Sequence, residues 1–96
     1  PDVFGRHLTS KRALIGEAKT ENDIANPHTE LQLTTYFRFL QSEGGGTIEV
    51  AVPWKGVDAM LFLMKKTHRL AAATEVSFSV SGWALPDADL CVVRHG

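Results

Sequence analysis

The 96 residues of this chain are enough for one domain with a single hydrophobic core. The formal net charge of -1 excludes a globally basic nucleic-acid binder, so any phosphate contact must come from a local patch or from bound metal ions. No apolar stretch reaches transmembrane length, and no membrane association is expected. Cys91 is the single cysteine and no basic and apolar leader is visible, which predicts a cytoplasmic, intracellular protein without disulfides.

The chain opens with a predicted β-hairpin. Residues 2–8 read as a short strand, residues 9–12 as a polar turn and residues 13–20 as the returning strand. Strand side chains alternate between two faces, so Glu17 and Lys19 share one face of the second strand. Pairing of the two strands would bring the carboxylates of Asp2 and Glu17 to neighbouring positions, which is the outline of a metal site.

A helix is predicted over residues 27–41. Asn26 is a suitable cap and Pro27 suits the first helical position. The core stripe of this helix recurs at i, i+4 and i+7, namely Leu33, Phe37 and Leu40. Gln32 and Tyr36 lie four residues apart on an adjacent face. The preceding polar segment, residues 21–23, is expected to lie outside the core.

Three further elements follow the glycine run at residues 44–46. Residues 47–52 alternate as a strand, and a right-handed crossover would make this strand parallel to the one that carries Glu17. A second helix is predicted over residues 57–72, with a core stripe of Val57, Met60, Leu61, Met64 and His68 and a solvent face of Lys65, Lys66 and Arg69. Residues 75–81 read as a half-exposed strand.

The last predicted element is a strand over residues 90–93, which follows breaks at Gly82 and Pro86 and pairs with the strand before it. The element order therefore predicts one α/β domain over residues 1–96, with an α+β mixed sheet. Its predicted order is hairpin, helix, parallel strand, helix and C-terminal hairpin.

Three features appear in a fixed order along the first half of the chain. Pro1-Asp2 precedes an apolar strand that ends in Glu17-Ala18-Lys19, and the next helix carries Gln32 and Tyr36. Over about residues 1–52 this order resembles the PD-(D/E)xK nuclease superfamily, and the Gln32 and Tyr36 pair is similar to the QxxxY feature of RecB-type nucleases. An acid-x-Lys triplet alone is common in charged sequences, but the ordered combination is more specific.

The resemblance implies a restriction-endonuclease-like core and metal-dependent hydrolysis of DNA, as an endo- or exodeoxyribonuclease. Asp2, Glu17 and the backbone carbonyl of Ala18 would be the ligands of Mg²⁺, with Mn²⁺ as a substitute. These are the hard oxygen donors that such ions prefer. Lys19 would orient or activate water and neutralise the scissile phosphate. The resemblance gives Gln32 and Tyr36 the role of positioning the substrate or Lys19.

Members of this superfamily usually carry a helix and a strand before the Pro-Asp strand, so we expect this domain to lack that part of the core. The Asp2 strand would then have an open edge. An upstream segment, a second copy in a homodimer, or the late strands at 75–81 and 90–93 could cover it.

Two other hypotheses compete with a nuclease. The first is a non-catalytic module of the same fold that binds nucleic acid or protein, and the second is a small α/β domain whose motif match is accidental. Glu17 and Lys19 would then be a solvent-facing pair, and Gln32 and Tyr36 helix-surface residues. His28 and His68 have no second His or Cys spaced to join them as metal ligands.

Overall fold

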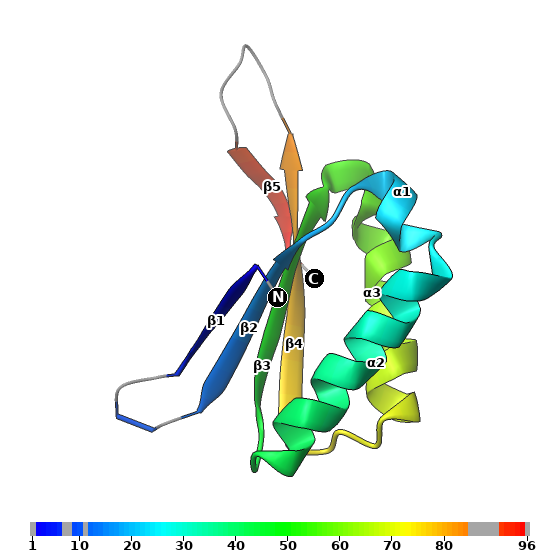
Figure 1. The fold of residues 1–96 in the computed structure, drawn as a ribbon. Coiled ribbons are helices and arrows are strands. Elements are labelled where there is room, and N and C mark those ends of the chain that lie inside the picture. Colours follow the sequence, from blue (N-terminus) through cyan, green and yellow to red (C-terminus); the bar gives the residue numbers. More distant parts are fainter. Residues whose placement is uncertain (1, 7–8, 11, 85–90, 96) are drawn as a thin grey trace.

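A computed structural model describes residues 2–6, 9–10, 12–84 and, for the backbone, 91–95. The described chain forms a five-stranded mixed sheet whose strands lie in chain order (Figure 1). The elements are β1 (Val3–Arg6), β2 (Ala13–Ala18), α1 (Glu21–Ile24), α2 (Pro27–Ser42), β3 (Gly46–Pro53), the 3-10 turn η1 (Trp54–Gly56), α3 (Val57–Leu70), β4 (Val76–Ala84) and β5 (Cys91–His95).

The pairing of the strands agrees with the predicted mixed sheet. β1 pairs with β2 and β4 with β5 in antiparallel fashion, while β2 with β3 and β3 with β4 are parallel. The late strands therefore lie beyond β3, and β1 remains at the opposite edge of the sheet. Late strands folded back over β1 are excluded by this order.

Helices α2 and α3 cover the same face of the sheet (Figure 1). The core lies between them and the sheet, and its largest fully buried apolar side chains are Phe37, Ile15, Leu33, Leu40, Ile48, Met60, Met64, Val50, Val52, Val57 and Val80. The opposite sheet face bears small or polar side chains at Gly16, Thr47, Glu49, Ala51 and Ser81, together with the apolar Val3 and Leu14 of the hairpin. In the described part of the chain, no helix is both long and apolar enough to span a membrane.

Helix α2 begins where the sequence predicts. The Asn26 side chain accepts a hydrogen bond from the His28 backbone N–H at 2.9 Å, and Pro27 takes the first turn. The predicted stripe of Leu33, Phe37 and Leu40 is fully buried. Local cap chemistry and a helical apolar period thus agree, and the prediction is confirmed to within one residue at the C-terminal end.

The N-terminal predictions need correction at their ends. The first strand is shorter than residues 2–8, and residues 7 and 8 lie outside the described residues, as does Pro1. β2 ends at Ala18, two residues before the predicted end, because the chain turns into α1 there. Thr20 and Asp23 form a reciprocal capping box, so the polar segment is a short helix, and none of its residues is buried, as expected.

The later predictions also need two corrections. Gly82 does not end β4; it is buried within the strand, opposite Val52. The helix α3 stops at Leu70, two residues early, and its core face also includes Leu63 and Thr67. The last strand is confirmed as a partner of β4, whereas Pro86, Leu90 and the Cys91 side chain lie outside what the structure describes.

His68 has a structural role in the packing of α3 against β4. Its Nε2 lies 2.9 Å from the Val76 carbonyl oxygen, and its ring packs 5.2 Å from those of Phe37 and Phe78. The contacts of this half-buried histidine are therefore with the backbone and with two aromatic rings.

Candidate active site

The candidate site begins with a carboxylate on the covered face of the sheet. In β2 the alternation that buries Ala13 and Ile15 also turns Glu17 toward α2, where it is only 7% exposed. The Tyr36 hydroxyl donates a hydrogen bond of 2.9 Å to Glu17 Oε1. A charged group in this position needs such a partner, because burial without one is costly.

This carboxylate is part of a closed ring of four side chains, namely Glu17, Tyr36, Gln32 and Lys19. Gln32 Nε2 donates to the Tyr36 hydroxyl at 2.8 Å, and Lys19 Nζ donates to Gln32 Oε1 at 2.5 Å. Lys19 Nζ lies 3.8 Å from Glu17 Oε2. The ring closes because Gln32 and Tyr36 are one helical turn apart, while Glu17 and Lys19 are two residues apart at the strand end.

The ring holds Tyr36 as a neutral hydrogen-bond donor. Burial, the hydrogen bond to Glu17 and the charge of Glu17 together raise the pKa of Tyr36 from 10.0 to about 12. The hydrogen bond from Gln32 acts in the opposite direction, and the negative charge of Asp2 adds a smaller upward contribution. The phenol therefore stays protonated at neutral pH and can act by orienting Glu17, not as a base.

Asp2 lies at the same end of β2 as this ring. Its Oδ2 accepts a 2.7 Å hydrogen bond from the Ala18 backbone N–H. The pairing of Val3 with Gly16 puts Asp2, the residue before Val3, beside Glu17. Asp2 and Glu17 therefore lie at neighbouring positions, as the predicted hairpin requires, although Asp2 precedes the strand.

The Ala18 carbonyl points to the same side as Asp2. Lys19 N–H donates to the Ala51 carbonyl at 2.9 Å, so the backbone groups of Lys19 face β3. Successive residues of a strand turn their backbone groups to opposite sides, and those of Ala18 face β1. Asp2, Glu17 and the Ala18 backbone carbonyl thus lie at the same end of β2.

This donor set fits Mg²⁺, an ion that typically takes one or two carboxylates and keeps several waters. Among the described residues, no group of three or more His, Cys, Asp or Glu side chains is arranged to hold a metal ion. The set formed by Asp2, Glu17 and the Ala18 carbonyl is correspondingly sparse, and it suits a hard cation that also binds its substrate directly.

A cavity of about 280 Å³ lies at this end of the sheet, and it is lined by Asp2, Val3, Gly16, Glu17, Ala18, Glu49, Val50, Ala51 and Ser81. Sequence reasoning did not single out Glu49. It is exposed on the uncovered face, opposite Gly16 in the parallel register. Two sequence features could have pointed to Glu49. It is an acid at an alternating position of a strand otherwise rich in Val and Ile, and the residue paired with it is a glycine.

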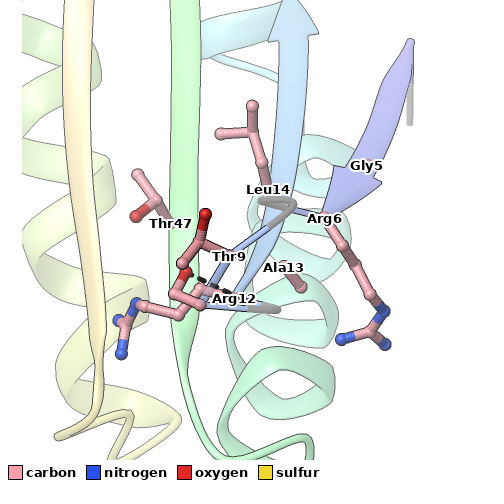
Figure 2. Close-up of a pocket in the computed structure, with 8 residues that line it drawn as sticks. Gly5, Arg6, Thr9, Arg12, Ala13, Leu14 and Thr47 are labelled. Carbon is pink, nitrogen blue, oxygen red and sulfur yellow. Dashed lines mark hydrogen bonds between the residues drawn. The ribbon is translucent and has the colours of Figure 1, made fainter.

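A larger cavity of about 700 Å³ lies at the other end of β2, and most of the residues that line it belong to the hairpin of β1 and β2 (Figure 2). Arg6 and Arg12 are among its lining residues, and their guanidinium groups point to opposite sides. Arg6 pairs with Glu43 at 2.6 Å, while Arg12 donates to the carbonyls of Gly46 and Glu75 at 3.3 and 3.2 Å. These contacts fasten the hairpin to α2 and to the start of β3 and β4.

Other residues singled out by sequence lie away from the ring. His28 is exposed in the first turn of α2. Lys65 and Arg69 are exposed on α3, and Lys66 forms an ion pair of 2.9 Å with Glu30.

Comparison of the chain with protein-family models, with curated protein sequences and with solved structures finds no match.

Proposed function

We propose that this domain hydrolyses phosphodiester bonds in DNA with the help of a divalent metal ion, through a site of PD-(D/E)xK type on a restriction-endonuclease-like core. One observation carries the proposal. The ring of Glu17, Tyr36, Gln32 and Lys19 fixes an ammonium beside a buried carboxylate, at the strand end where Asp2 also lies.

The burial of this pair argues against an ordinary surface ion pair. The side chains of Lys19 and Glu17 are 12% and 4% exposed, whereas those of the Arg6 and Glu43 pair are 40% and 38% exposed. Removing two charges from water is costly, and an exposed pair would satisfy the fold equally well. Buried ionisable groups with shared hydrogen bonds are concentrated at functional sites.

Each residue then has a chemical role. Asp2, Glu17 and the Ala18 carbonyl would hold Mg²⁺ or Mn²⁺, and the ion supplies a Lewis acid that stabilises negative charge on phosphate oxygens. Lys19 presents a compact cation to the scissile phosphate and to the attacking water. Tyr36 orients Glu17 and Gln32 orients Lys19, so both are positioning residues.

Nicking of supercoiled plasmid DNA in Mg²⁺ and in Mn²⁺ tests the proposal. We expect Glu17→Gln and Lys19→Ala each to lower the nicking rate by about 100-fold or more, because each removes a group that acts in the transition state. Glu21→Gln and Lys65→Ala are matched controls on exposed helix positions and should nick at the unmodified rate. Equal rates in the site variants and in their controls would refute the assignment.

A second candidate function is a non-catalytic DNA-binding module of the same fold. The sparse donor set favours it, because no three His, Cys, Asp or Glu side chains among the described residues are arranged to hold a metal ion. Retarded migration of plasmid DNA without nicking in either metal ion would support this function over hydrolysis.

A further inference from the structure

The outer edge of β1 lies beside an exposed apolar surface. Phe4 and Phe39 are 48% and 43% exposed, and their rings pack at 6.0 Å in a tilted arrangement. Together with Ile15, Thr35 and Tyr36 they line a cavity of about 420 Å³. Two large aromatic side chains left this open beside an edge strand are typical of an interaction surface.

The backbone of this edge can accept another strand. Ala18 turns its backbone groups toward β1, and by alternation so does Gly16. Val3 is paired with Gly16 and therefore turns its own groups inward, which leaves the N–H and C=O of Phe4 directed outward. Among the described residues, no strand lies on this side of β1.

We propose that the occupant is a second copy of this chain, joined edge to edge through an antiparallel pair of β1 strands centred on Phe4. The choice of a second copy as the occupant rests on the charges of Asp2 and Arg6. In that register Asp2 of each copy lies opposite Arg6 of the other, so the edge is complementary to itself under a two-fold axis. An outward-facing residue at the centre also allows both Phe4 residues to exchange N–H···O=C bonds.

The same pairing covers the exposed aromatic rings. Paired strands share a face with their partners, so both Phe4 rings meet on the helix-covered side, next to both Phe39 rings. The two β2 strands then lie about 14 Å apart, at three strand spacings. Leu31, 62% exposed on α2, is brought toward the equivalent helix of the second copy. A continuous ten-stranded sheet results, and its assembly does not depend on nuclease activity.

Two charge-reversal variants test the register. Arg6→Asp leaves two acids facing two acids across the axis, and Asp2→Arg leaves two bases facing two bases. We expect the unmodified chain to dimerise in sedimentation velocity between about 1 and about 100 µM, and each variant alone to associate about 100-fold more weakly. An equimolar mixture of the two variants restores opposite charges and should form a heterodimer with the affinity of the unmodified dimer.

Glu43→Gln is the control, because it removes the ion pair between Arg6 and Glu43 within the chain and leaves the two-fold charge pairs intact. It should dimerise like the unmodified chain. The proposal is overturned if the unmodified chain stays monomeric over this range, if either variant alone dimerises normally, or if the mixture remains monomeric while both variants give the native circular dichroism spectrum. A monomeric result would indicate another occupant of the edge, such as a segment upstream of Asp2.

Discussion

Tyr36 is the only tyrosine in the sequence, so its ionisation can be followed directly by tyrosinate absorbance. We expect the native protein to titrate with a midpoint near pH 12, since its pKa is raised from 10.0 to about 12. Glu17→Gln should lower the midpoint, because it removes the neighbouring charge. The midpoint should still remain above 10, because burial is the largest cause of the shift.

The same shift links Tyr36 to alkaline stability. The folded state favours the protonated phenol, so this contribution is fully present below pH 10 and is lost as the pH rises toward about 12. Denaturant titrations of the unmodified chain should show a steeper loss of stability in that window than those of Tyr36→Phe. If stability fell equally steeply with pH in both proteins, the Tyr36 phenol would not be held by its hydrogen bonds to Glu17 and Gln32 as the structure has it.

The proposed metal site makes a prediction for two individual carboxylates at the same strand end. Asp2 and Glu17 would provide the side-chain oxygens, so we expect Mn²⁺ binding in calorimetry to disappear in the Asp2→Ala, Glu17→Ala double variant. Lys19→Ala should retain most of the affinity, since its ammonium is not a ligand. Full binding in the double variant would place the ion elsewhere.

At the scale of elements, the turn from α2 into β3 depends on two glycines of different kinds. Gly45 has φ of +119° and an added Cβ would lie 2.6 Å from the Glu75 carbonyl oxygen, whereas Gly44, with φ of +89°, has open space around it. We expect Gly44→Ala to lower the free energy of unfolding by about 1 kcal/mol. Gly45→Ala should cost about 3 kcal/mol or more, since it adds a clash with backbone to the strained dihedral. Equal midpoints in urea unfolding would contradict this difference.

The predictable elements are those whose signals are local. The cap at Asn26, the proline after it and the helical apolar period all lie within α2, and they predicted it nearly to the residue. The α1 helix was missed because it spans only four residues and depends on a capping box in a segment with no apolar period. Gly82 was misread because its place in β4 depends on pairing with Val52, thirty positions earlier, which no local pattern reveals.

The candidate site, like the fold, was predicted from the sequence only in part. Strand alternation predicted that Glu17 and Lys19 would share a face, and the hairpin predicted Asp2 beside them. Residue types alone did not join Gln32 and Tyr36 to these groups, since that contact depends on how α2 packs over β2; the family resemblance suggested it. Glu49 was missed because its relation to Gly16 depends on the parallel register.

At the scale of the molecule, β3 is the central strand, paired on both sides by parallel neighbours. We expect the amide protons of its buried residues Ile48, Val50 and Val52 to exchange most slowly with solvent, and those of β1 most quickly at low concentration. Hydrogen exchange with residue resolution measures this. Protection of β1 equal to that of β3 in dilute protein would contradict the assigned order of strands.

The agreement between strand order and chain order also has a consequence during synthesis on the ribosome. Each strand from β2 onward joins the exposed side of the strand made just before it, so no later segment has to insert between two strands that are already paired. The sheet can therefore lengthen vectorially as the polypeptide emerges, with each crossover helix closing over the newest pair. Nascent chains long enough for Leu70 to have left the exit tunnel should already pair β2 with β3, while β4 is still inside the tunnel.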